Sequence, residues 1–198
     1  MRQKIAIAVL ISGTGSNCRN IIQYFEEHRF IHVSLIIANK ENTGAPAISR
    51  DTGVPYRVVN RADFYENARI LEILKKEEIQ YLILAGFLWL IPDFLVKAFP
   101  QRIINIHPAL LPKYGGKGMY GMKVHQAVKD AGERHTGITI HLVNEKYDEG
   151  EILSQEKVKI EAADSPEDIA QKVHQLEYQF FPEIIEKYIM KQSKLAQE

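Results

Sequence analysis

The sequence is poor in cysteine and in long apolar runs. Cys18 is the single cysteine among 198 residues, so no disulfide can form within the chain and no cysteine-rich zinc site is possible. No run approaches the ~20 apolar residues that span a membrane. The short apolar run at 4–11 follows a basic start but ends in a glycine turn without the cleavage pattern of a signal peptide. We therefore expect a cytoplasmic protein that does not bind membranes.

The chain also lacks an excess of charge of either sign. Lys plus Arg and Asp plus Glu are 25 each, whereas nucleic-acid binders usually carry a basic surplus. This balance argues against a nucleic-acid partner but leaves room for a local basic pocket that holds one small anion. The length and the 45% hydrophobic content suit one globular domain over residues 1–198.

Apolar runs of strand length alternate with segments of helical period through the first half of the chain. The predicted strands are 4–11, 32–38, 56–59, 81–86 and 102–107, and the predicted helices are 17–28, 43–53, 62–78 and 92–98. This alternation is typical of βαβ units. The sequence therefore predicts an α/β fold with a doubly wound, mostly parallel sheet.

The last third of the chain has a different pattern. Residues 136–144 and 151–160 alternate between apolar and polar and are separated by the turn sequence YDEG, which predicts an antiparallel edge. A long closing helix is expected over 164–190, capped by Asp164 or Ser165, with Pro182 as a place where it can kink.

A glycine-rich turn, SGTGSN at 12–17, lies between the first predicted strand and helix. Gly13 and Gly15 allow a tight turn, and Ser16 and Asn17 can donate hydrogen bonds to an anion at the helix N-terminus. The dinucleotide-binding pattern would need glycine where Cys18 stands. Two interpretations stay open, a phosphate site and an ordinary strand-to-helix turn. We expect Cys18 to pack in the core rather than to act as a nucleophile.

The strand 102–107 ends in an unusual pair of polar residues. Asn105 and His107 are two positions apart and so face the same side, at the sheet edge where ligands bind in α/β folds. An amide N–H and an imidazolium N–H that converge there suit the oxyanion of a carbonyl under attack. No nucleophilic residue accompanies them, which implies that the substrate supplies the nucleophile. A structural role for both side chains is the alternative.

Two carboxylates are candidates on weaker grounds. Asp148 lies in a loop after the strand 136–144; if it reaches His107 it favours the charged imidazolium, but the residues by themselves favour a plain acidic turn. Glu177 falls within a predicted helical stripe of Val173, Leu176, Phe180 and Ile184. A buried carboxylate needs a partner, which is either a nearby Lys or Arg or a substrate.

Five segments, ISGTGSN, LAGFLWLI, NIHPALLPKYGG, GITIHLVNEKYDEG and VHQLEYQFFPEII, occur in the order and at close to the spacing found in one enzyme family. From residue 4 to about 190 the chain resembles the phosphoribosylglycinamide formyltransferases. The resemblance implies transfer of a formyl group from 10-formyltetrahydrofolate to the glycyl amine of glycinamide ribonucleotide, in de novo purine synthesis. It implies a nucleotide-binding-like half, 4–100, and a catalytic and folate-binding half, 101–190.

The same resemblance assigns site residues and a mechanism. Asn105 and a protonated His107 stabilise the tetrahedral intermediate, and Asp148 keeps His107 charged. The implied contacts to glycinamide ribonucleotide are Gly13, Thr14, Gly15, Ser16, Asn17, His174 and Glu177. The implied folate contacts are Leu88, Trp89, Leu90, Ile91, Asn105, Asn144, Glu145, Lys146, Tyr147 and Asp148.

Several residues depart from this pattern or stay unassigned. Trp89 stands where some relatives carry arginine, and the glycine-rich stretch 113–125 suggests a mobile lid. His125 is expected to begin the next helix, either on the surface or near the substrate. His135 and His141 share a strand face but lack a third ligand, so we predict no metal.

Three alternatives are weighed against this assignment. A formyltetrahydrofolate hydrolase shares the catalytic core but carries an N-terminal regulatory domain, for which a first strand at residue 4 leaves no room. Formyltransferases that act on aminoacyl-tRNA carry an additional C-terminal domain and a basic surface. A non-catalytic mononucleotide-binding module would need only the glycine turn. The sequence does not decide between a monomer and a homodimer.

Overall fold

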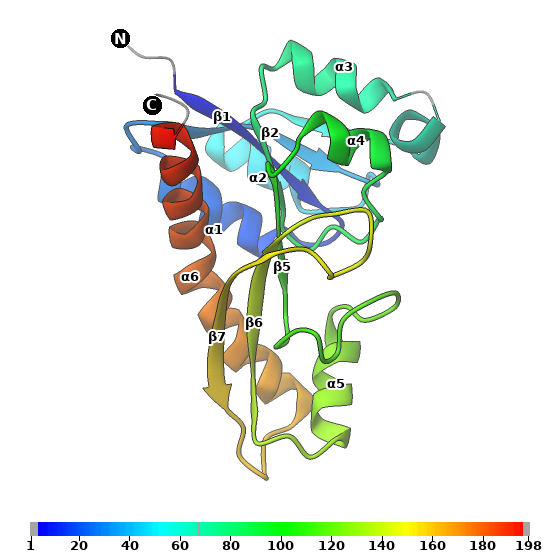
Figure 1. The fold of residues 1–198 in the computed structure, drawn as a ribbon, viewed down its shortest axis with the longest axis vertical. Helices are drawn as coiled ribbons and strands as arrows, with labels where there is room; N and C mark the ends of the chain where they lie inside the picture. The colour runs from blue at the N-terminus through cyan, green and yellow to red at the C-terminus, as the bar shows by residue number, and fades with distance from the viewer. Residues whose placement is uncertain (1–3, 67, 196–198) are drawn as a thin grey trace. The chain divides into compact units, whose positions relative to one another are not determined.

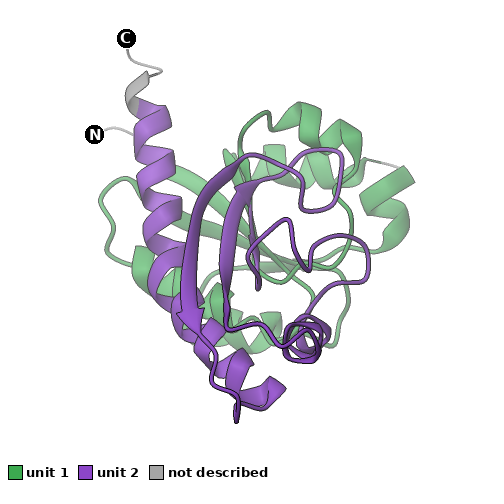
Figure 2. Cartoon of the chain, turned by 60° about the horizontal axis from the view of Figure 1, so that its bottom comes forward, with its two compact units in different colours: residues 1–104 green, residues 105–198 purple. Residues whose placement is uncertain are grey.

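Strands and helices alternate along the computed structural model, which describes residues 4–66 and 68–195 (Figure 1). The chain divides into two compact units, residues 1–104 and 105–198 (Figure 2). The seven strands follow the order β3-β2-β1-β4-β5-β6-β7. The predicted α/β fold with a mostly parallel sheet and an antiparallel C-terminal edge is confirmed.

The first unit contains the βαβ part of the fold. Its elements are β1 (Ile5–Ile11), α1 (Ser16–Phe25), β2 (Ile31–Ala38), α2 (Ala45–Thr52), β3 (Tyr56–Val58), a short π-helical turn η1 (Ala62–Glu66), α3 (Arg69–Lys76), β4 (Tyr81–Leu84) and α4 (Asp93–Ala98). Strand β1 pairs in parallel with β2 and β4. Its residues from Ala6 onward are buried, because this strand has a neighbour on each side and apolar side chains on both faces.

The second unit carries the end of β5 and everything that follows. Strand β5 (Ile103–His107) is followed by α5 (Met122–Asp130), β6 (His135–Leu142), β7 (Ile152–Lys159) and α6 (Pro166–Leu195). Strands β6 and β7 pair antiparallel, with an irregularity in the register between Ile140 and His141. Gly137 is required in this pair, because a Cβ atom there would lie 1.9 Å from the carbonyl oxygen of Glu156.

Two predicted helices differ from the structure. The helix expected over 62–78 is divided into η1 and α3; residue 67 lies outside the described residues, and Ala68 adopts a left-handed φ of 50°, which a continuous helix does not allow. The closing helix extends to Leu195 and continues through Pro182. Ser165 caps it, since its Oγ accepts the Asp168 amide at 3.1 Å.

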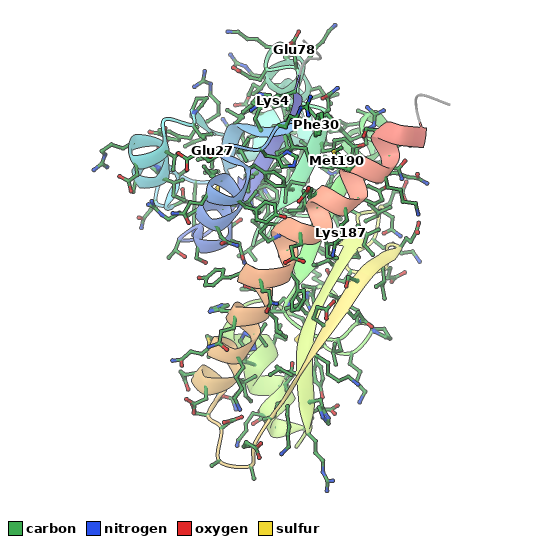
Figure 3. All side chains as sticks on the ribbon, turned by 90° about the vertical axis from the view of Figure 1, so that its left-hand side faces the viewer. Lys4, Glu27, Phe30, Glu78, Lys187 and Met190 are labelled. Atoms are coloured by element: carbon green, nitrogen blue, oxygen red, sulfur yellow. The ribbon has the colours of Figure 1, made fainter. Side chains whose placement is uncertain are left out.

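The buried stripe of α6 is shifted from the predicted one. It runs through Val173, Glu177, Phe181, Ile185 and Ile189, at a spacing of four residues, and Leu176, Phe180 and Ile184 are only half-buried. Glu177 is buried as expected, at 6% exposure. Lys187 and Met190 lie on the C-terminal half of this helix (Figure 3). Within the described residues, no helix has the length and apolar character needed to cross a membrane.

Candidate active site

Polar side chains from distant parts of the second unit meet at the carboxyl end of β5. Asn105 and His107 lie two positions apart at the end of this strand, with their side chains on the same face. Asp148, in the loop between β6 and β7, contacts His107. The Asp148 Oδ2 atom lies 3.5 Å from His107 Nδ1, and its Oδ1 atom lies 3.6 Å from His141 Nε2. The acidic turn therefore reaches the imidazole, which the sequence alone could not establish.

The ring of His107 is almost fully buried and is held at both nitrogens. Its Nε2 atom lies 2.7 Å from the backbone carbonyl oxygen of Tyr114, which can only accept a hydrogen bond, so Nε2 carries a proton. Burial lowers the pKa of His107 below 6.5, although the charge of Asp148 and the Tyr114 carbonyl both act to raise it. The expected effect of Asp148 has the right sign, but burial is the larger influence and lowers the pKa overall; the role of a protonated His107 in the reaction stays a prediction.

Asp148 contacts a backbone amide as well as the two imidazole rings. Its Oδ2 atom accepts the Gly116 amide at 2.8 Å, and its own φ of 55° lies in the left-handed region. Burial raises the pKa of Asp148, but the His141 and His107 rings and the Gly116 amide together lower it below 3.8. The carboxylate is therefore ionised at neutral pH and faces two imidazoles.

His141 is part of this site. From the sequence we considered it only as a metal ligand and rejected that role because a third ligand was lacking. Its Nε2 atom lies 3.0 Å from Asn105 Nδ2, and the side chain is 2% exposed. The signal in the sequence was its place near the end of an alternating strand, on the face opposite to that of the neighbouring apolar residues. That pattern does not predict which residue His141 contacts, because Asn105 is 36 positions away in the sequence.

His125 is buried rather than on the surface, and it lies in the fourth position of α5 rather than at its beginning. The predicted loop 113–125 therefore ends earlier, at Gly121. His125 lies beside the ring of His174, with 6.5 Å between centroids. Burial, and then the charges of His174 and His107, lower the pKa of His125 to about 4. Its Nδ1 atom has no hydrogen-bond partner among the described residues.

The buried His125 should make the protein sensitive to acid. Between pH 6.5 and the native pKa of about 4 the unfolded state binds the extra proton, so the free energy of unfolding falls as the pH falls. A shift of this size corresponds to about 3 kcal/mol between pH 7 and pH 4. Urea unfolding at the two pH values should show that His125→Gln loses about 3 kcal/mol less than the wild type. The exposed His135→Gln is the control, and equal losses in all three proteins would contradict the assignment.

The glycine turn of the first unit is shaped by close packing. Gly15 has a φ of 76°, and a Cβ atom there would lie 2.7 Å from Ile48 Cδ1. Gly44, which the sequence did not single out, fits against the turn: its amide donates to the Gly13 carbonyl at 3.0 Å, and a Cβ atom on it would lie 1.8 Å from the Thr14 carbonyl oxygen. Thr14 and Ser16 are exposed and Asn17 is half-buried.

The predicted folate residues of the first unit, 88–91, follow β4. The Leu88 amide donates to Ser12 Oγ at 2.9 Å, and the Leu90 carbonyl accepts the Tyr65 hydroxyl at 2.9 Å. Leu88 is exposed, Ile91 is buried, and Trp89 packs in an aromatic cluster with Phe64, Tyr65 and Phe87. The guanidinium of Arg61 lies 5.4 Å from the Trp89 ring centroid, so a cation is present here although residue 89 is not arginine.

The remaining predicted residues lie in the second unit. Glu145, Lys146 and Tyr147 are exposed beside Asp148, and Asn144 Oδ1 accepts the Lys146 amide at 3.0 Å. His174 is exposed on α6 and stacks on Tyr178, with 6.3 Å between ring centroids. The start of the stretch 113–125 is anchored, because Lys113 and the Tyr114 hydroxyl both bond to Glu133. Its mobility as a lid stays a prediction.

Cys18 is fully buried, and burial raises the pKa of its thiol to about 12. A thiol of this kind is a poor nucleophile, which agrees with a packing role. Among residues 4–66 and 68–195 no three His, Cys, Asp or Glu side chains are grouped so that they could hold a metal ion. The predicted absence of a metal stays a prediction.

The chain matches the model of the formyl transferase family over residues 5–185. It is 43% identical over 185 residues to a chloroplastic phosphoribosylglycinamide formyltransferase of Arabidopsis thaliana, a match that covers 90% of this chain and 63% of that protein. It is also 33% identical to the trifunctional purine biosynthetic protein adenosine-3 of Bos taurus, covering 93% of this chain and 18% of that protein. The chain thus spans about six-tenths of the length of the plant relative.

Solved structures give the same result. The crystal structure of phosphoribosylglycinamide formyltransferase from Brucella melitensis has a TM-score of 0.84 and 30% sequence identity, covering 94% of this chain and 96% of that one. The structure of glycinamide ribonucleotide transformylase 1 from Symbiobacterium toebii has a TM-score of 0.83, also at 30% identity, and covers 92% and 86% of the two chains. The chain belongs to the formyl transferase family, in the group that contains the phosphoribosylglycinamide formyltransferases.

Proposed function

We propose that the protein transfers the formyl group of 10-formyltetrahydrofolate to the glycyl amine of glycinamide ribonucleotide, a step of purine synthesis. The observation that carries the proposal is the group at the carboxyl end of β5, where Asp148 faces both His107 and His141 and His141 contacts Asn105, in a chain of the formyl transferase family. Membership in this family implies a folate-derived formyl donor. The identity of the donor as 10-formyltetrahydrofolate is part of the proposal.

The proposed reaction needs no covalent intermediate on the enzyme. The lone pair of the amine attacks the formyl carbon, a C–N bond forms, and the carbonyl electrons move to the oxygen. Asn105 donates an N–H to this oxyanion. The ammonium of the intermediate then releases a proton, and the bond from the formyl carbon to N10 of the folate breaks as N10 takes up a proton.

His107 is suited to carry that proton. Burial lowers its pKa, and in the neutral form of the ring Nδ1 is the nitrogen without a proton, because Nε2–H bonds to Tyr114. Accepting the amine proton converts the ring to the imidazolium, which the ionised Asp148 stabilises and which helps to stabilise the oxyanion. Giving the proton to N10 restores the neutral ring.

The binding roles of the remaining residues are also proposals. In the first unit, the backbone and side chains of Gly13, Thr14, Gly15, Ser16 and Asn17 are assigned to the phosphate of the ribonucleotide, at the N-terminus of α1. Also in this unit, Leu88, Trp89, Leu90 and Ile91 are assigned to the folate. In the second unit, His174 and Glu177 are assigned to the ribonucleotide, and Asn105, Asn144, Glu145, Lys146, Tyr147 and Asp148 to the folate.

One assay tests the activity and separates the alternatives. Purified protein is incubated with 10-formyltetrahydrofolate, with and without glycinamide ribonucleotide, and formylated ribonucleotide, tetrahydrofolate and formate are quantified. The proposal predicts equal amounts of formylated ribonucleotide and tetrahydrofolate, and no turnover without the amine. Formate release that does not depend on the ribonucleotide would identify a hydrolase, and ribonucleotide binding without turnover would identify a binding module.

Gly44→Ala should weaken ribonucleotide binding. The added Cβ atom meets the Thr14 carbonyl oxygen, which is backbone and cannot rotate away, so the glycine turn must shift. Loss of one or two charge-assisted bonds to the phosphate should raise KM for glycinamide ribonucleotide by about 10–100-fold and leave KM for the folate unchanged. Steady-state kinetics with Thr43→Ala as the neighbouring control measure this, and an unchanged KM would argue against a phosphate site at the turn.

Location and assembly stay predictions. The plant relative is named chloroplastic, so the expected cytoplasmic location is not supported by that relative. The proposed substrates are small molecules. The expectations of no nucleic-acid partner, of no membrane association and of a monomer or homodimer also remain to be tested.

A further inference from the structure

The ring of His141 is buried at 2% exposure and has a partner at each nitrogen. Its Nδ1 atom lies 2.8 Å from the Leu142 carbonyl oxygen, and its Nε2 atom lies 3.0 Å from Asn105 Nδ2. The Oδ1 atom of Asp148 also faces Nε2 but lies farther away, at 3.6 Å. Asn105 Nδ2 is therefore the nearer of the two polar groups that face Nε2.

These partners determine where the ring carries its proton. A carbonyl oxygen only accepts, so Nδ1 carries the hydrogen that it donates to Leu142. In the neutral ring Nε2 then has a lone pair and accepts, and the atom that faces it must be a donor. The side-chain amide of Asn105 meets this requirement with Nδ2, not with Oδ1.

The backbone around His141 fixes the ring in this position. The register between β6 and β7 shifts between Ile140 and His141, an irregularity of the kind that redirects a side chain next to an active site. The Leu142 carbonyl cannot move toward the following loop, because Gly150 packs so closely that a Cβ atom there would lie 1.7 Å from that oxygen. The Leu142 amide is also fixed, by a 2.8 Å bond to the Glu151 carbonyl.

We propose that His141 is a positioning residue that sets the orientation of the Asn105 amide, so that one N–H is held by the ring and the other is free for the substrate oxyanion. This inference rests on the proposed formyl transfer. Without an acceptor at Nε2 the amide can rotate by half a turn at no cost, and Oδ1 then faces the oxyanion. The partial negative charge of Oδ1 would then face the oxyanion, and the stabilisation that an Asn105 N–H provides would be lost.

Kinetics of two variants at this position test the proposal. Glutamine has a carbonyl oxygen that can replace the Nε2 acceptor, whereas leucine has none. His141→Leu should lower kcat by about 10²–10³-fold, the usual effect of losing an oxyanion donor, with both KM values within about threefold of the wild type. His141→Gln should recover most of this loss, which a role in packing alone would not predict.

A double-mutant cycle separates action through Asn105 from a general loss of structure. In an Asn105→Ala background, His141→Leu should lower kcat by less than about threefold, because the group that it positions is already absent. Equal factors in the two backgrounds would overturn the proposal, as would near-normal turnover of His141→Leu. His135→Leu, an exposed change on the same strand, is the control.

A measurement on the unmodified protein does not depend on activity or on the folding of a variant. Nuclear magnetic resonance of 15N-labelled protein should show an unprotonated Nε2 in His141 and a scalar coupling from it to Asn105 Nδ2. A protonated Nε2 in the free protein would overturn the inference. A wild type that lacks formyl transfer while showing this coupling would refute the proposed function and leave the hydrogen-bond assignment standing.

Discussion

Replacing His107 with alanine should lower kcat for formyl transfer by about 10²–10⁴-fold, the usual contribution of a positioned general acid or base. The reason lies in the path of the proton. In the proposed reaction the amine loses a proton and N10 of the folate gains one, and His107 is a buried titratable group whose Nδ1 faces the Asp148 carboxylate at 3.5 Å. Without it the transfer has to proceed through water.

Measurement of kcat and both KM values should show that the loss lies in kcat. His135→Ala, which removes an exposed histidine from the same unit, is the matched control and should keep wild-type turnover. Urea unfolding of both variants shows whether a loss comes from a folding defect. Near-normal turnover of a folded His107→Ala protein would mean that the proton does not pass through His107.

Much of the fold could be read from the local pattern of the sequence. The strands β1, β2 and β5 lie within a residue of the predicted ranges, because long apolar runs between glycine, proline or polar residues leave little choice. The Asn105 and His107 pair could be placed at a sheet edge for the same reason. A residue two positions from another on a strand shares its face wherever the strand lies in the fold.

The contacts of this pair could not be read from the sequence, because they depend on distant residues. Asp148 reaches His107 only because its loop adopts a left-handed φ and accepts the Gly116 amide, and neither feature has a local signature. The role of His141 likewise depends on a partner 36 positions away. The burial of His125 was missed because the glycine-rich sequence before it suggested a longer loop.

The direction in which the pKa of His107 is shifted could not be read from the sequence for a related reason. Its charge depends on the balance between burial and the nearby carboxylate, and the sequence shows the carboxylate but not the burial. The surroundings of Glu177 were also not predicted correctly, because the buried stripe of α6 is shifted by one position and different apolar residues are buried with Glu177. Helical periodicity gives the presence of such a stripe more securely than its register.

Asn105→Ala should lower kcat by about 10²–10³-fold and leave both KM values within about threefold of the wild type. The amide acts on the oxyanion, which carries its full charge only after the amine has attacked, so its removal affects the transition state more than the bound substrates. Asn105→Asp should be at least as slow, because a carboxylate of the same shape has no hydrogen to donate and adds a negative charge beside the oxyanion.

Steady-state kinetics with both substrates varied distinguish this role from ground-state binding. The control is Gln126→Ala, which removes an exposed amide whose partner, Asp130 on the same helix, lies 2.7 Å away. If Asn105→Ala instead raised KM for the folate and kept kcat, the amide would serve to bind the donor, in agreement with its assignment to the proposed folate contacts. The oxyanion role, and with it the reason for His141 to orient the amide, would then be wrong.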